Sequence, residues 1–280
     1  MAGVRRVIFT EHGREHDDSP VRQWLDRQAA RYTDVVVAVS DRLAAYMENT
    51  VHIDAAQIKT IHNGVDTTLF SPGAAPESLR RRLAIPDAAI VIGSVGRLER
   101  VKAHERLLAA VQQLRDRVSQ PVVAVICGDG SQRDALLAEA SQLGIADSVR
   151  LSGWLDNPVD AYRLFDVFVL PSRSEGQSIS LMEAMSCGVP AVVTDVGANA
   201  EMLGADLREQ VVPSEPGAAL VDAIAATLEK TRRSREIGAA VRQRALDHYS
   251  LDRMVRQYES LYRDGLRQAI EPAAAIAGFG

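Results

Sequence analysis

The sequence predicts an α/β protein built on parallel sheets. Short runs of β-branched and other apolar residues alternate with segments of helix length along nearly the whole chain. Most of these runs are continuously apolar, which is typical of parallel strands covered by helices on both faces. The chain has 280 residues, 46% of them hydrophobic, enough for two packed units. The predicted strands are VRRVIFT, DVVVAVS, IKTIH, AIVIGSV, PVVAVICG, VRLSG, DVFVLP and PAVVTD.

A turn-rich segment divides this alternation. Residues 63–76, NGVDTTLFSPGAAP, collect Gly, Pro, Asn, Asp and Ser, which predicts a connection between two packed units. We expect a first unit over residues 1–66, a linker over 67–76, and a second unit over 77–248 with a complete doubly wound sheet. With two or three strands, the first unit is predicted to be an incomplete domain, and its open sheet edge would invite self-association.

The end of the chain predicts one more helix. Residues 249–267 contain a Ser cap at Ser250 and carry apolar residues at three- and four-residue spacings. We expect this helix to cross back to the first unit, and residues 268–280 to form a frayed tail. The apolar positions are Met254, Tyr258, Leu261 and Tyr262.

Composition excludes several classes of function. Lys and Arg number 32 against 37 Asp and Glu, and the net charge of −5 leaves no basic field for nucleic acid. Cys127 and Cys187 lie in apolar runs, which predicts reduced, buried thiols and neither a disulfide nor a metal framework. No run of about twenty apolar residues and no signal-peptide pattern occurs, so we expect a cytoplasmic protein.

Two glutamates flank a predicted helix start after the strand DVFVLP. Glu175 lies in the turn, Ser178 can cap the helix, and Glu183 follows about a turn and a half later. In parallel sheets ligands bind at the carboxyl ends of strands, where a helix start offers free N–H groups to an anion. The glutamates are too far apart to share a proton, so we expect them to accept hydrogen bonds from ligand hydroxyls. Alternatively, Glu175 is a turn residue and Glu183 a solvated helix residue.

A second strand end carries positive charge. Arg97 and Lys102 follow AIVIGSV and precede a helix that is predicted to end near Arg117. A forked guanidinium and an ammonium at this edge of the sheet would hold a diphosphate from two sides. The alternative is that both are ordinary surface charges.

Together these motifs resemble the retaining glycosyltransferases of the GT-B fold, in the group-1 or family-4 set, which have two Rossmann-like domains. The resemblance extends from about Thr10 to Tyr262 and rests on the order and spacing of its motifs. It implies that Arg97, Lys102 and Gly96 form the loop that binds the donor diphosphate. The motifs are NGVDTTLF, GRLERVK, ICGDG, LSGW, and the E-x7-E motif EGQSISLME followed by AMSCGVPAVVT.

The resemblance also implies roles for the two glutamates. Glu175 would contact sugar hydroxyls near the reacting carbon, and Glu183 would hold the ribose. Backbone N–H groups at Gly176, Ser178 and Ile179 would meet the phosphate.

Two further residues are carried over from the family. His12, in TEHG, would face the donor sugar across the cleft, or it is a polar loop residue. Trp154, in the loop 153–155, would lie at the edge of the nucleotide base and contact it. We expect His104 to be an ordinary surface residue.

The implied function is transfer of a sugar from a nucleotide-diphosphate sugar to a saccharide or lipid-linked acceptor, with retention of configuration and with neither metal nor cofactor. The resemblance makes surface polysaccharide or lipopolysaccharide synthesis the expected pathway, at the inner face of the plasma membrane with peripheral contact. A catalytically silent nucleotide-sugar-binding or interaction module is the alternative.

The sequence departs from the family in two places. The chain starts late in the family's first domain. We therefore expect it to be a fragment, the product of a mis-started reading frame, or a shortened relative. Gln177 and Ser178 stand where Phe-Gly is common, so we expect the Ser178 hydroxyl to contact phosphate. A dinucleotide-binding oxidoreductase is disfavoured, because Arg133 replaces the third glycine of the pattern that begins Gly128-x-Gly130.

Overall fold

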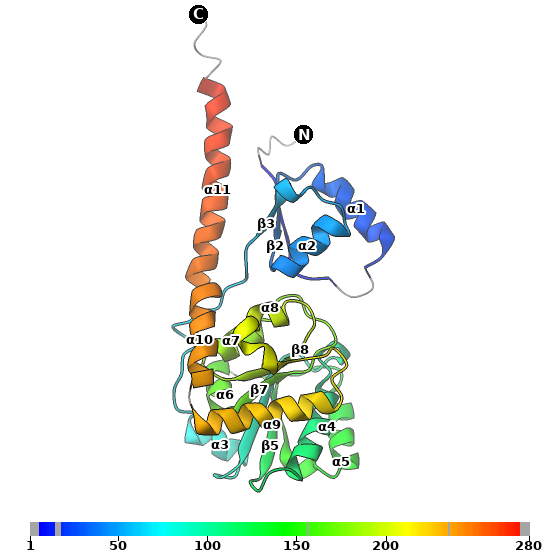
Figure 1. Ribbon diagram of the computed structural model, residues 1–280, viewed down its shortest axis with the longest axis vertical. Helices are drawn as coiled ribbons and strands as arrows, with labels where there is room; N and C mark the ends of the chain where they lie inside the picture. The colour runs from blue at the N-terminus through cyan, green and yellow to red at the C-terminus, as the bar shows by residue number, and fades with distance from the viewer. Residues whose placement is uncertain (1–5, 15–17, 156, 235, 275–280) are drawn as a thin grey trace, which may run out of the picture.

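The computed structural model describes residues 6–14, 18–155, 157–234 and 236–274, and side chains in the last helix as far as Arg263. It contains two parallel sheets, one of three strands in the order β1-β2-β3 and one of six in the order β6-β5-β4-β7-β8-β9 (Figure 1). The predicted α/β class with parallel sheets is therefore confirmed.

The first sheet carries helices on both faces. Ala30, Leu43 and Met47 from the two helices of this unit pack on one face of β2. Leu261 from the last helix packs on Val35 and Val37 of the same strand, on the other face. The elements are β1 (Ile8–Glu11), α1 (Pro20–Ala30), β2 (Val35–Ala38), α2 (Asp41–Asn49), a 3₁₀ turn η1 (Ala55–Gln57) and β3 (Ile58–Thr60).

The second sheet is doubly wound. Its central strands are buried except for Val95 at the end of β4, because helices cover both faces, as their continuous apolar sequences predict. The strands and η turns are β4 (Ile90–Val95), η2 (Arg100–Lys102), β5 (Val122–Cys127), η3 (Ala146–Ser148), β6 (Val149–Gly153), β7 (Val167–Leu170), β8 (Ala191–Thr194), η4 (Ala205–Gln210) and β9 (Val211–Val212). The helices are α3 (Glu77–Arg82), α4 (His104–Arg115), α5 (Arg133–Gln142), α6 (Pro158–Leu164), α7 (Ile179–Ser186), α8 (Asn199–Leu203), α9 (Ala218–Arg233), α10 (Glu236–His248) and α11 (Leu251–Ala274).

Two features of this unit differ from the sequence predictions. β9 is a strand of two residues that the sequence did not predict, because so short a run carries no periodicity. α11 continues to Ala274, so residues 268–274 are helical and not a tail; their Gln, Glu and Ala residues are good helix formers, although Pro272 lies among them. Residues 275–280 of the predicted tail lie outside the described residues.

The chain passes between the two units at two places that are bonded to each other. Val65 donates its N–H to Tyr249 and accepts the N–H of Leu251, both at 2.9 Å. Beyond this crossing α11 runs alongside the first unit (Figure 1), where Tyr258 forms a 3.3 Å hydrogen bond with Thr10. The last helix therefore contacts the first sheet.

Cys127 and Cys187 are free and buried, as predicted. Among the residues that the structure describes, no helix combines the length and apolar character needed to cross a membrane.

Candidate active site

The candidate site lies where the second sheet reverses its strand order. β4 pairs with β5 on one side and with β7 on the other, so the loops after β4 and β7 emerge side by side. The first of these loops carries Lys102 and the second carries Glu175. This is the switch point at which open parallel sheets bind ligands.

Lys102 and Glu175 form a largely buried ion pair. Lys102 Nζ lies 2.7 Å from Glu175 Oε1, and the side chains are 18% and 7% exposed. Ser172 donates a second hydrogen bond to the same oxygen at 2.6 Å. Glu175 Oε2 forms no hydrogen bond within the described part of the chain, so this oxygen remains available to a ligand hydroxyl.

The helix α7 begins beside this pair. Ser178 is its N-cap, and the Ser178 hydroxyl accepts the N–H of Leu181 at 3.4 Å. This hydroxyl is buried and also bonds Ser180, so the expectation that it contacts phosphate is not supported. The first N–H groups of a helix have no intrahelical acceptor, and Ile179 at this end is 45% exposed. The start of α7 therefore offers backbone donors, not a side-chain hydroxyl.

Glu183 is not a solvated helix residue. Its Oε2 accepts a 2.5 Å hydrogen bond from the hydroxyl of Tyr162, which is fully buried. Burial raises the pKa of Glu183, and the Tyr162 hydrogen bond acts in the opposite direction. The pKa of Tyr162 is raised well above its ordinary value, first by burial and then by the charge of Glu183.

The β4 loop places Arg97 and Lys102 differently. Arg97 is exposed, and no hydrogen bond or ion pair from its side chain is found among the described residues. A side chain at Gly96 would touch the stem of Lys102, at 3.7 Å from its Cε. Gly96 therefore lies next to the Lys102 chain, whereas the Arg97 guanidinium is free to reach a ligand.

His12 comes to the site through its backbone. A Cβ on Gly176 would lie 2.2 Å from His12 O, and a Cβ on Gly13 would lie 2.9 Å from Gly176 Cα. The loop after β1 and the loop after β7 therefore pack backbone to backbone, a contact that only glycine permits. The His12 side chain is exposed, and its role toward a donor sugar stays a prediction.

Trp154 follows β6, which is separated from β4 by β5. Its side chain is 73% exposed and does not line the cavity beside Glu175. Its predicted contact with a base remains an expectation.

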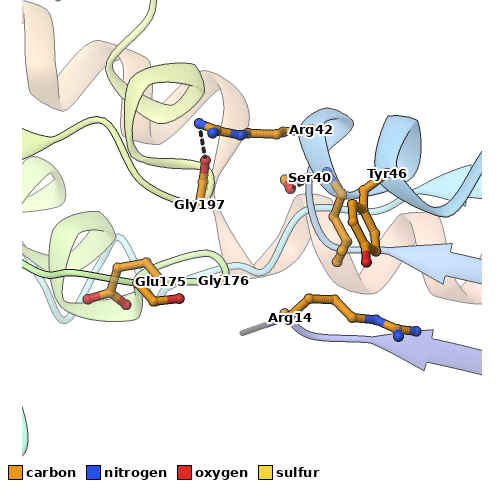
Figure 2. Close-up of a pocket in the computed structure, with 10 residues that line it drawn as sticks. Arg14, Ser40, Arg42, Tyr46, Glu175, Gly176 and Gly197 are labelled. Atoms are coloured by element: carbon orange, nitrogen blue, oxygen red, sulfur yellow. Dashed lines mark hydrogen bonds between the residues drawn. The ribbon is translucent and has the colours of Figure 1, made fainter. Parts of the chain in front are cut away.

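A cavity of about 210 Å³ lies between the two units beside Glu175. In Figure 2, Glu175, Gly176 and Gly197 border it from the second unit, opposite Ser40, Tyr46 and Arg14 of the first. Sequence reasoning missed the lining residues of the first unit, although Ser40 ends the predicted strand DVVVAVS and the strand-end rule applies to it. The lining residues are Gly13, Arg14, Ser40, Arg42, Leu43, Tyr46, Ser174, Glu175, Gly176 and Gly197.

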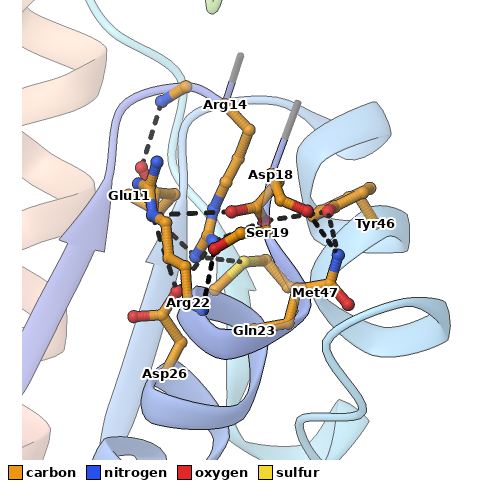
Figure 3. Close-up of polar contacts among 10 residues, drawn as sticks. Glu11, Arg14, Asp18, Ser19, Arg22, Gln23, Asp26, Tyr46 and Met47 are labelled. Atoms are coloured by element: carbon orange, nitrogen blue, oxygen red, sulfur yellow. Dashed lines mark hydrogen bonds and ion pairs between the residues drawn. The ribbon is translucent and has the colours of Figure 1, made fainter. Parts of the chain in front are cut away.

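The charge of Arg14 is balanced within the first unit (Figure 3). Its guanidinium lies 2.9 Å from Glu11 and 2.7 Å from both Asp18 and Asp26. Burial alone would lower the pKa of Arg14, but these carboxylates, Glu11 first, outweigh it and raise the pKa. Asp18 also accepts a 2.8 Å hydrogen bond from Tyr46, so the network holds one wall of the cavity in place.

Polar contacts join the two units at the rim of the cavity. Both oxygens of Glu201 accept backbone N–H groups at the start of α2, from Asp41 and Arg42 at 3.1 Å. The Arg42 side chain contacts Asp195 and the carbonyl of Gly197, each at 3.2 Å. We call these contacts of Glu201 and Arg42 the interdomain latch. The loop after β8 that carries Asp195 and Gly197 follows a predicted strand, the signal that could have identified it.

One group of residues could hold a metal ion. Ligand atoms of Asp41, His62 and Glu201 lie within 4.8 Å of one another. Both Glu201 oxygens already accept backbone hydrogen bonds, so Glu201 acts here as a helix cap.

His104 corrects a sequence expectation. It is 3% exposed and not a surface residue, because it begins α4 with its ring turned into the protein. Burial, helped by the nearby charge of Lys102, lowers its pKa to about 4.

Two family models match the chain. The model for glycosyl transferases group 1 matches residues 76–244, and the model for glycosyltransferase family 4 matches residues 1–69. A D-inositol 3-phosphate glycosyltransferase of Thermobifida fusca is 36% identical over 214 residues, 70% of this chain and 47% of that protein. A lipopolysaccharide core biosynthesis mannosyltransferase of Rhizobium meliloti is 29% identical over 270 residues, 94% of this chain and 73% of that protein.

Solved structures share the fold. A glycosyltransferase from Rickettsia africae aligns with a TM-score of 0.81 at 18% identity, covering 92% of this chain and 70% of its own. The HepE protein of Anabaena, solved with UDP and glucose, aligns with a TM-score of 0.82 at 20% identity, covering 92% and 71%.

Two parallel sheets with a cleft between them, and a site at the strand ends of the second sheet, define a protein of the GT-B fold. The chain belongs to the group-1 glycosyl transferases, whose model matches more than half of its residues. It spans about half to two thirds of the length of several relatives, 47% for the Thermobifida protein and 64% for one from Corynebacterium urealyticum.

Proposed function

We propose that the protein transfers a sugar from a nucleotide-diphosphate sugar to a saccharide or lipid-linked acceptor, with retention of configuration and without a metal ion. The observation that carries this proposal is the Lys102–Glu175 pair, which lies beside the start of α7 and whose Glu175 lines the cavity between the units. At this edge of the sheet, a cation and free backbone donors match the diphosphate of such a donor, and the carboxylates of Glu175 and Glu183 match the hydroxyls of its sugar and its ribose.

The charges suggest how Lys102 and Glu175 would change their contacts when the donor binds. Without ligand, the Lys102 ammonium is balanced by Glu175 at 2.7 Å. A diphosphate would compete for Lys102, with Arg97 and the start of α7 as further donors. Glu175, still held by Ser172, would then accept hydrogen bonds from sugar hydroxyls.

Catalysis would come from stabilising the leaving group. The nucleoside diphosphate gains negative charge as the glycosidic bond breaks, so Lys102 and Arg97 bind it more strongly in the transition state. In this proposal the acceptor hydroxyl attacks from the face of the leaving group, and a donor phosphate oxygen takes its proton.

The acceptor and the pathway are also proposals. The Rhizobium relative is named for lipopolysaccharide core synthesis, and a relative from Mycolicibacterium smegmatis, 31% identical over 260 residues, for a phosphatidylinositol mannoside. These names favour an acceptor in the synthesis of cell-surface glycans, and the inner face of the plasma membrane is the location that we propose with it.

Titration with a panel of UDP-, GDP- and ADP-sugars in EDTA, followed by assay of sugar transfer to saccharide acceptors, tests this function. Lys102→Ala is expected to lower transfer at least about tenfold through lost leaving-group stabilisation. Lys59→Ala is the control, because Lys59 is exposed on β3. Transfer by Lys102→Ala within twofold of the parent, or a strict need for added metal, would contradict the proposal.

The same experiment separates the alternative, a silent nucleotide-sugar-binding module. Donor binding that depends on Lys102 but gives neither transfer nor release of nucleoside diphosphate would favour that module.

A further inference from the structure

Tyr162 lies behind the candidate site and is fully buried, yet its hydroxyl reaches a residue of the site. From α6 it donates a 2.5 Å hydrogen bond to Oε2 of Glu183 on α7. A buried phenol requires a hydrogen-bond partner, and a carboxylate is a strong one. Glu183 forms no other side-chain hydrogen bond within the described residues, so Tyr162 alone orients its carboxylate.

The position of this hydroxyl is determined by the core. The Tyr162 ring lies edge-on to Phe70 and Phe165, with centroids 5.9 Å apart in both cases. Phe168 of β7 lies 6.0 Å away on a tilted plane. Three aromatic neighbours leave the ring little freedom, because close-packed interiors hold side chains in single rotamers.

We propose that Tyr162 is a positioning residue for nucleotide recognition: it binds Oε2 of Glu183 and so leaves Oε1 for a ribose hydroxyl of the donor. This assignment rests on the proposed function, in which Glu183 receives the ribose. In this assignment the two carboxylate oxygens of Glu183 have different partners: the protein binds Oε2, and Oε1 is available to the ligand.

The electrostatics agree with this division. Burial raises the pKa of Glu183, and the Tyr162 hydrogen bond opposes the rise. Without the hydroxyl the carboxylate would be protonated more readily and would turn more freely about its last torsion. Both changes would weaken it as an acceptor for ribose hydroxyls.

Tyr162→Phe tests the assignment, because it removes the hydroxyl and keeps the ring. Isothermal titration would compare UDP, GDP and ADP with their 2′,3′-dideoxy counterparts. The parent is expected to bind the matching ribonucleotide at least about tenfold more tightly than the dideoxy form, since a hydrogen bond to a charged group is worth that much. In Tyr162→Phe this preference is expected to fall at least about fivefold, while affinity for the dideoxy form stays within about twofold.

Two further variants make the test specific. Tyr258→Phe loses a hydroxyl that bonds Thr10 in the first unit, and it is expected to keep the full preference for ribose. If Tyr162 acts through Glu183, the double variant Tyr162→Phe/Glu183→Gln has the same preference as Glu183→Gln alone.

The assignment would be overturned if Tyr162→Phe has the same melting temperature as the parent and also keeps the parent's preference for the ribonucleotide. Additive losses in the double variant would also overturn it. If the parent binds none of the three nucleotides, the proposed function itself fails, and the assignment fails with it.

Discussion

His104 is a buried, uncharged residue next to the cationic Lys102. It is 3% exposed, and its Nδ1 has no hydrogen-bond partner among the described residues. Burial lowers its pKa to about 4, with a smaller effect from Lys102. The imidazole is therefore neutral near pH 7 and adds no second positive charge beside the candidate diphosphate site.

His104 should make the folded state sensitive to acid. Its folded pKa lies below the unfolded value of about 6.5, so its contribution to stability is complete above pH 6.5 and is lost as pH falls toward 4. The loss would reach roughly 3 kcal/mol at about 1.4 kcal/mol per pH unit. Urea unfolding at pH 7, 6 and 5 measures it.

The comparison needs two variants. The stability lost by the parent between pH 7 and pH 5 is expected to exceed that lost by His104→Phe by about 2 kcal/mol. His52→Asn is the control at an exposed histidine, where Asn accepts the left-handed backbone at φ 62°. Equal losses in the parent and in His104→Phe would contradict a buried neutral imidazole.

Residue types at strand ends were predictable, but their partners were not. Lys102, Glu175 and Glu183 follow from the strand-end rule and the family motif. Their bonds to Ser172 and Tyr162 depend on which strands are neighbours and on how α6 packs against α7, and one sequence does not encode these contacts in a local pattern.

At the scale of the element, the N-terminal end of α7 has two roles: Ser178 caps the helix there, and its first backbone N–H groups are available to an anion. Ser178 caps its first turn, so the helix begins at Ile179, where the N–H groups and the positive end of the helix dipole face the candidate phosphate site. Neither α7 nor α1 carries an acidic residue in its first turn. For α7 this absence is consistent with a site that must accept an anion.

Ile179→Asp separates the two roles. An acidic residue in the first turn stabilises a helix by about 0.3–1 kcal/mol, so thermal stability should be kept or slightly raised. The same charge would repel a diphosphate, and affinity for nucleoside diphosphates is expected to fall at least about tenfold.

Val21→Asp is the matched control. Val21 is 68% exposed in the first turn of α1, which also begins with a serine cap. Val21→Asp is expected to change thermal stability as Ile179→Asp does and to leave the affinity for nucleoside diphosphates unchanged. Equal effects of the two variants on nucleotide affinity would exclude the start of α7 as the phosphate site.

At the scale of the whole molecule, backbone and polar contacts join the two units beside the cavity. Gly13 and Gly176 touch through their backbones, and the interdomain latch joins α2 to the loop after β8. Exposed polar contacts of this kind are individually modest. The chain crosses between the units at the bonded pair Val65 and Tyr249.

The latch predicts a local change in hydrogen exchange. Removing the carboxylate in Glu201→Ala is expected to speed exchange of the Asp41 and Arg42 amides at least about tenfold, because a charge-assisted hydrogen bond is worth about 1.5–3 kcal/mol. Arg173→Ala, which breaks an exposed ion pair with Glu105 inside the second unit, is the control. Unchanged protection at Asp41 and Arg42 in Glu201→Ala would show that the latch does not hold the units together.

Sequence patterns alone predict the α/β class, the strand ends that carry Lys102 and Glu175, and the cap of α7. These depend on local patterns: apolar periodicity, turn residues and short motifs. Only the tertiary structure decided that Lys102 pairs with Glu175, that Tyr162 orients Glu183, and that Glu201 caps a helix of the other unit. Each of these contacts joins residues far apart in the chain, and their distance is set by strand order and by the packing of whole helices.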